Sequence, residues 1–133
     1  MGADKTLVDT SAWIQYLNLP DFPQGHAIRK WLERGHAHTT GLIVAELIQG
    51  ARNERDLEAI DIIAETAVVL EPTTTTWMTA GRLSRDLRKK GLTIPLQDCL
   101  LAVLAVDHGL KLFTLDRHFT LINKHYPLHM TDH

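Results

Sequence analysis

The chain has 133 residues, a formal net charge of −2 and a single cysteine, Cys99. This length fits one domain of ordinary size, and such a domain buries enough surface to fold without disulfides. One cysteine excludes an intrachain disulfide, which suits a reducing compartment. The first residues lack a signal-peptide core, and no apolar run approaches the roughly 20 residues of a membrane span. We therefore expect a cytoplasmic protein without a membrane partner.

Apolar periodicity and breaker residues predict strands that alternate with helices along the chain. The expected strands are residues 6–8, 37–40, 67–70 and 111–115, with 128–130 as an added edge strand. The expected helices are residues 12–17, 27–32, 42–51, 57–63, 77–90 and 98–107, with a short one from 117. The threonines at 73–76 are expected to cap the helix over 77–90. This order predicts an α/β fold with a mostly parallel central sheet and helices on both faces, in one domain over residues 1–133.

Two of the predicted strands run into an aspartate. Asp9 follows the strand over 6–8, and Asp116 follows the strand over 111–115. The carboxyl ends of parallel strands meet at one edge of the sheet, where ligands bind in open α/β folds. Two further acids, Glu46 and Asp98, lie on predicted helices. We expect the fold to bring all four to that edge.

Each acid also has an ordinary structural explanation. Asp9 and Asp98 stand where N-cap residues occur, and Glu46 could sit at a helix edge and reach water. The four acids together indicate a cation site more strongly than any one of them, because crowded carboxylates repel one another unless a cation holds them. Carboxylate oxygens suit Mg²⁺ or Mn²⁺ better than zinc. The pattern therefore favours a divalent-metal site.

In these stretches the chain resembles the PIN-domain ribonucleases, and most closely the VapC toxins of bacterial toxin–antitoxin pairs. The matching segments follow the family order across almost the whole chain; they are Leu7–Ala12, Val44–Leu47, Asp98–Ala102 and Gly109–Phe119. The resemblance implies a PIN-like three-layer fold. It maps the catalytic, metal-binding acids onto Asp9, Glu46, Asp98 and Asp116, with Ser11 and Thr114 as polar neighbours. His118 would also line the site, where many relatives carry another acid.

The resemblance implies an endoribonuclease that depends on Mg²⁺ or Mn²⁺ and acts as the toxin of a type II toxin–antitoxin pair. In such chemistry a divalent ion lowers the pKa of bound water and stabilises the leaving oxygen of the RNA phosphodiester. The implied partners are RNA, a VapB-like antitoxin and a second copy of the chain. We expect the antitoxin to place an Arg or Lys among the acids and to fill a groove between early helices, lined by Trp13, Ile14, Leu17, Ile43 and Leu47.

The net charge of −2 argues against nucleic-acid binding, because such proteins usually carry a basic balance. Divalent ions on the four acids would leave the rest of the chain positive. Arg82, Arg85 and Lys89 recur at spacings of three and four, which places them on one helix face. This face is a candidate RNA-binding surface, and an ordinary solvated helix face is the alternative.

Two other functional classes stay open at this stage. A receiver-like signalling domain is also a small α/β fold with an acidic Mg²⁺ pocket, but it needs a phosphoacceptor aspartate after a central strand. The candidate central strand, Val68 to Leu70, runs into Glu71-Pro72 instead. The other alternative is a catalytically inactive PIN-type binding module. RNA cleavage with and without metal separates these possibilities.

Overall fold

The computed structural model describes residues 5–19 and 21–131, and within these ranges the chain folds into strands that alternate with helices. The strands are β1 (Thr6–Val8), β2 (Ala37–Thr40), β3 (Val68–Leu70) and β4 (Lys111–Phe113). The helices are α1 (Thr10–Asn18), α2 (Pro23–Glu33), α3 (Gly41–Gln49), α4 (Glu54–Thr66), α5 (Thr74–Lys89), α6 (Leu96–Asp107) and α7 (His118–Asn123).

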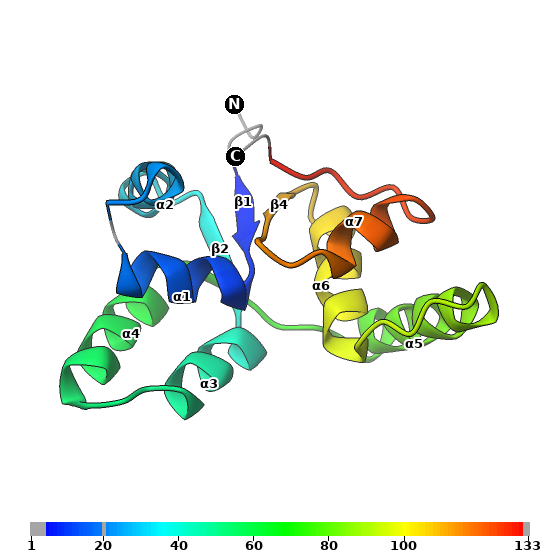
Figure 1. Ribbon diagram of the computed structural model, residues 1–133, viewed down its shortest axis with the longest axis horizontal. Coiled ribbons are helices and arrows are strands. Elements are labelled where there is room, and N and C mark those ends of the chain that lie inside the picture. Colours follow the sequence, from blue (N-terminus) through cyan, green and yellow to red (C-terminus); the bar gives the residue numbers. More distant parts are fainter. Residues whose placement is uncertain (1–4, 20, 132–133) are drawn as a thin grey trace.

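Among the described residues the strands form one sheet in the order β3-β2-β1-β4, and every pair in it is parallel. Figure 1 shows α1 to α4 on one side of the strands and α5 to α7 on the other. The predicted α/β fold, with a parallel sheet between two helical layers, is confirmed. β3 lies at the edge of the sheet, with Val68 and Val69 about two-fifths exposed. The strand considered as the central one for a receiver-like domain is therefore an edge strand.

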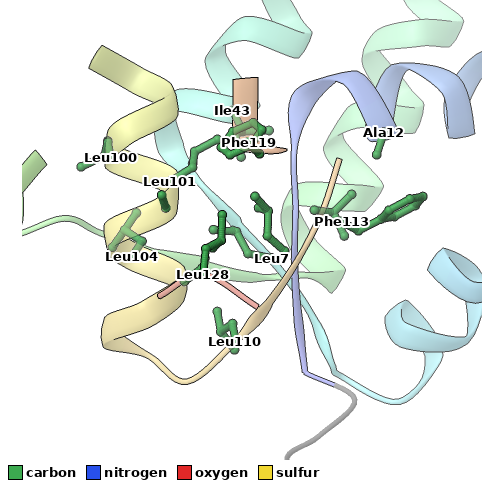
Figure 2. Packing of buried hydrophobic residues seen from close by; sticks show 14 of the residues in the cluster. Leu7, Ala12, Ile43, Leu100, Leu101, Leu104, Leu110, Phe113, Phe119 and Leu128 are labelled. Carbon is green, nitrogen blue, oxygen red and sulfur yellow. The ribbon is translucent and has the colours of Figure 1, made fainter. Parts of the chain in front are cut away.

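β1 and α6 supply the centre of the core. All three residues of β1 are fully buried, because strands flank it on both sides and helices cover both faces. α6 is buried over eight consecutive residues, from Asp98 to Ala105. In Figure 2, leucines of α6 gather with Leu7 of β1 and Leu128 in one apolar cluster. The site described below therefore adjoins the buried centre of the core.

Several elements begin or end away from their predicted limits. α5 begins at Thr74 rather than residue 77, because Thr73 caps it in a reciprocal pair with Thr76. α6 begins at Leu96, two residues earlier than predicted, and β4 ends at Phe113, two residues earlier than predicted. Instead of an edge strand over 128–130, Met130 makes an isolated parallel bridge to Leu112.

Within the described part of the chain, none of the helices is both long enough and apolar enough to pass through a bilayer.

Candidate active site

Asp9 is the first residue after β1, and its side chain turns toward β4 instead of capping α1. Its backbone N–H continues the sheet by donating to the Phe113 carbonyl at 2.9 Å. Although Asp9 occupies the N-cap position, its carboxylate makes no capping bond. Its Oδ2 instead accepts from Ser11 Oγ at 2.9 Å and from Thr114 Oγ1 at 2.8 Å. The N-cap explanation of this acid therefore fails.

The same two hydroxyls hold the turn after β4, and Ser11 ties it to the start of α1. The Leu115 N–H donates to Ser11 Oγ at 3.0 Å, and the Asp116 N–H donates to Thr114 Oγ1 at 2.9 Å. The N–H of His118 then donates to Asp116 Oδ1 at 2.9 Å. These bonds explain why β4 ends at Phe113. The backbone leaves the sheet there, and the turn places the hydroxyl of Thr114 and the side chains of Asp116 and His118 at the site.

Glu46 reaches the site from α3, which leaves the carboxyl end of β2 directly. Thr40 caps this helix, since its hydroxyl accepts from the Ile43 N–H at 3.1 Å. Glu46 lies in the second turn, half-buried, and its Oε1 accepts from Thr10 Oγ1 at 3.0 Å. Sequence reasoning missed Thr10, whose only signal was its place beside Asp9. The bond shows that Glu46 is held toward Asp9 rather than extended into solvent.

Asp98 is the third residue of α6, where Pro95 and not Asp98 is the N-cap. Its pKa is raised from 3.8 to about 6, chiefly because burial disfavours the charged carboxylate. The negative charges of Asp9 and Asp116 act in the same direction, while the hydrogen bond with His118 opposes them. His118 Nδ1 lies 2.8 Å from Asp98 Oδ2 and 3.3 Å from Asp116 Oδ1.

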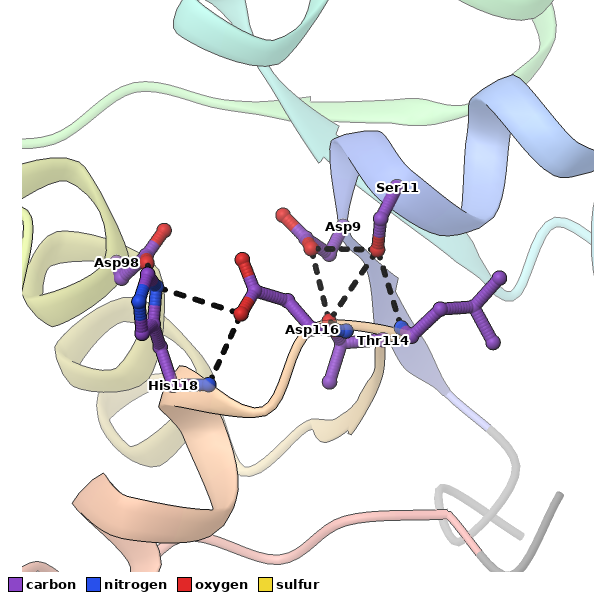
Figure 3. Close-up of polar contacts among 7 residues, drawn as sticks. Asp9, Ser11, Asp98, Thr114, Asp116 and His118 are labelled. Carbon is purple, nitrogen blue, oxygen red and sulfur yellow. Dashed lines mark hydrogen bonds and ion pairs between the residues drawn. The ribbon is translucent and has the colours of Figure 1, made fainter.

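These side chains surround one cavity of about 190 Å³ at the carboxyl edge of the sheet. Figure 3 shows Asp9, Asp98 and Asp116 of this group with Ser11, Thr114 and His118. Asp9, Glu46, Asp98 and Asp116 all line it, together with Thr10, Ser11, His118, Pro95, Gln97 and Leu101. Each of the four carboxylates has one oxygen hydrogen-bonded to a donor of the chain. Within the described residues, no donor contacts the second oxygen of any of them.

This arrangement fits a divalent cation. Ligands of bound metals usually have their other polar atom fixed by a second hydrogen-bond partner, as these carboxylates do. Asp98 and Asp116 offer ligand atoms that lie within 4.8 Å of each other and of a nitrogen of His118. Burial first, and then the charges of Asp9 and Asp116, raise the pKa of Asp98, so a bound cation would favour its charged form.

The chain matches the family described as "PIN domain" over residues 6–124. The chain belongs to the PIN domain family. A related PIN protein is ribonuclease VapC11 of Mycobacterium tuberculosis, 26% identical over 120 residues that cover 87% of this chain and 90% of that protein.

Solved structures agree on the PIN fold. A chain of VapBC-1 from nontypeable Haemophilus influenzae superposes with a TM-score of 0.74 at 25% identity, covering 96% of both chains. A chain of VapBC2 from Rickettsia felis, bound to a DNA fragment from its promoter, has a TM-score of 0.77 at 18% identity. That match covers 95% of this chain and 96% of the other.

Arg82, Arg85 and Lys89 lie on α5 of the PIN domain, outside the acidic cavity. All three are exposed, and in the described part of the chain no ion pair involves them. The same helix exposes Trp77, which is 43% accessible, whereas Trp13 and Trp31 belong to the core. The structure therefore leaves this basic face accessible without bringing it among the acids.

Proposed function

We propose that this PIN domain is a metal-dependent endoribonuclease and the toxin of a type II toxin–antitoxin pair. The observation that carries the proposal is the set of four carboxylates around one cavity, each with one oxygen fixed by the chain and one available. The family and the name of the ribonuclease relative support the reaction class.

Asp9, Asp98 and Asp116, with Glu46, would hold Mg²⁺ or Mn²⁺. When bound, such an ion supplies an acidified water and offsets the negative charge that develops on the cleaved phosphodiester. The chain supplies the positioning. Ser11 and Thr114 orient Asp9, Thr10 orients Glu46, and the start of α7 orients Asp116.

RNA cleavage by single-site variants tests the proposal. Asp9→Asn and Asp116→Asn remove one charge each while keeping the shape of the side chain, so we expect each to abolish cleavage of a structured RNA in Mn²⁺ or Mg²⁺. The matched control is Asp61→Asn, an exposed aspartate of α4 far from the cavity in sequence, which should cleave like the wild type. EDTA should stop the wild-type reaction, and added metal should restore it.

Two results would count against this assignment. Folded wild-type protein that cleaves no RNA with either metal would favour the inactive binding module. Full cleavage by Asp9→Asn would place the chemistry elsewhere. The receiver alternative has lost its basis, because its candidate central strand is β3 at the sheet edge and the chain belongs to the PIN family.

A second cavity supports an antitoxin partner. It measures about 170 Å³, and its apolar lining comes from α1, α3 and α4, with polar residues at its margin. The apolar side chains include Ile14, Leu17, Leu47 and Ile60, and the polar ones are Asn18, Glu46, Arg52 and Asp56. Glu46 lines both this groove and the acidic cavity. A peptide that fills the groove would thus end beside the acids, where an arginine could form paired hydrogen bonds with carboxylates. Trp13 and Ile43, which we expected to line the groove, are fully buried core residues.

Co-purification with the product of a small adjacent reading frame tests the partner. We expect Leu17→Glu to weaken the complex, because it places a charge in the apolar groove, while cleavage by the free toxin continues. Leu19→Glu is the matched control, since Leu19 is 56% exposed and does not line the groove. Equal binding by the two variants would place the partner on another surface.

We also propose that residues 1–133 form a single PIN domain, that the protein acts in the cytoplasm, and that it forms a homodimer. The family match over residues 6–124 supports the first point. Sedimentation of the purified chain at several concentrations tests the homodimer.

A further inference from the structure

The site contains a nitrogen donor at a place where four acids already converge. Among the described residues, Asp98, Asp116 and His118 form the one group of potential ligands whose donor atoms lie within 4.8 Å of one another. Asp9 and Glu46 line the same cavity but stand outside this tightest group. The nearest set of donors is therefore mixed, with two carboxylates and one imidazole.

The residues before and after His118 in the chain fix the position of its imidazole ring. His118 is the first residue of α7, and its backbone N–H is fixed by Asp116 Oδ1. The next residue, Phe119, is fully buried, as is Ile122 one turn later, so α7 is anchored to the core. Figure 3 shows the ring beside Asp98 and facing Asp116. The ring is thus positioned in advance, at little cost in side-chain entropy.

The spacing of these atoms suits shared coordination. His118 Nδ1 lies 2.8 Å from Asp98 Oδ2 and 3.3 Å from Asp116 Oδ1. Both distances, and the spacing of all three donor atoms within 4.8 Å of one another, are short enough for the three side chains to contact one ion. In this structure His118 Nδ1 and Asp98 Oδ2 share a hydrogen bond. Coordination of an ion by Nδ1 would replace that bond.

We propose that His118 is a direct nitrogen ligand of the divalent ion and biases this site toward first-row transition ions such as Mn²⁺ over Mg²⁺. Mg²⁺ takes oxygen ligands and gives up its water reluctantly. Imidazole suits Fe, Ni, Cu and Zn, and Mn²⁺, which also accepts carboxylates, is the first ion of the same transition series. The inference rests on the proposed metal-dependent function. It concerns which ion the site selects and through which atom.

Electron spin-echo spectroscopy of Mn²⁺ bound to the wild-type protein is the direct test, because it detects coupling to a ligating ¹⁴N independently of any RNA cleavage. We expect nitrogen coupling in the wild type and its loss in folded His118→Asp. The matched control is His125→Asp, which alters an exposed histidine just beyond α7 and should keep the coupling. Calorimetric titration with Mn²⁺ and Mg²⁺ should show the affinity ratio falling roughly 10-fold or more in His118→Asp, by comparison with the loss on removing groups around a metal.

Bound Mn²⁺ without nitrogen coupling in the wild type would overturn this inference and leave the nuclease proposal intact, since His118 would then only hydrogen-bond to Asp98. An unchanged Mn²⁺-to-Mg²⁺ ratio in His118→Asp would overturn it as well. Nitrogen coupling in a wild-type protein that cleaves no RNA would support the inference while the proposed function fails. No Mn²⁺ binding at all would overturn both.

Discussion

Asp98 experiences two unfavourable effects at once. It is 8% exposed on a helix buried nearly all round, and it faces the charges of Asp9 and Asp116. Both effects favour the protonated carboxyl, which is why its pKa rises to about 6. In the metal-free protein, the folded state therefore holds a proton on Asp98 at pH values where the unfolded chain has lost it.

Asp98→Asn should stabilise the metal-free protein in a pH-dependent way. Below about pH 4 Asp98 is protonated in both states and the substitution should change little. Between about pH 4 and 6 the folded wild type binds more protons than the unfolded chain, so its free energy of unfolding falls as the pH rises. Above pH 6 the variant should be more stable by roughly 2–3 kcal/mol. Urea denaturation at pH 4 and pH 7.5 measures this, and an equal difference at both pH values would contradict it.

At the residue scale, the sequence indicated the four acids, and the family resemblance added Ser11 and Thr114 as polar neighbours, but neither predicted the individual hydrogen bonds. Asp9 and Asp116 were recognisable because each follows an apolar run, and Asp98 because it precedes the most apolar stretch of the chain. The bond between Thr10 and Glu46 joins residues 36 positions apart, and the two bonds to Asp9 come from both ends of the chain. Such contacts depend on tertiary packing, which local periodicity does not encode.

α5 carries the candidate RNA-binding face. Changing Arg82, Arg85 and Lys89 to glutamate should weaken RNA binding and flatten its salt dependence, because fewer phosphate contacts release fewer counterions. Changing Arg29, Lys30 and Arg34 of the α2 region is the matched control, since these are also three exposed basic residues. Binding of a non-cleavable RNA, measured across salt concentrations, gives the two slopes. If RNA binding by both triple variants depends on salt with the same slope, the basic face of α5 is an ordinary solvated surface.

The start of α5 depends on the reciprocal bonds between Thr73 and Thr76. Thr73→Ala should lower the free energy of unfolding by about 1 kcal/mol, because the Thr76 N–H loses its acceptor. Thr75→Ala, which alters an exposed threonine two residues after Thr73, should leave the free energy of unfolding nearly unchanged. Thermal denaturation of the two variants measures the difference. Equal losses of stability in both would contradict a specific contribution of the Thr73 cap.

At the element scale, the order and type of the elements could be predicted, whereas several limits could not. The threonines at 73–76 have weak helix propensity, so a pattern-based start at residue 77 was natural; the cap places the start three residues earlier. Residues 114 and 115 continue the apolar alternation of β4, but the hydroxyl of Thr114 is needed by Asp9 and the chain leaves the sheet. The exposure of β3 reflects its edge position, which the sequence of a parallel strand does not reveal.

The site joins both helical layers, because α3 lies on one side of the sheet and α6 and α7 on the other. An ion held by these acids should therefore stabilise the whole molecule by mass action, since it binds only the folded chain. We expect Mn²⁺ at 100 times its dissociation constant to add about 2.7 kcal/mol to the free energy of unfolding of the wild type. Asp9→Asn should lose most of this gain in a thermal-shift titration, whereas Asp61→Asn should keep it.

β4 also sets when the molecule can become active during its own synthesis. Asp9 and Ser11 are made early, but Thr114, Asp116 and His118 are made about a hundred residues later, and hydrogen bonds of the candidate site join the two groups. A growing chain emerges N-terminal end first at roughly 5–20 residues per second. The residues of α1, α3 and α4 therefore emerge before the residues that complete the acidic cavity. An inhibitor that bound these early segments cotranslationally would reach the chain seconds before the acids can assemble.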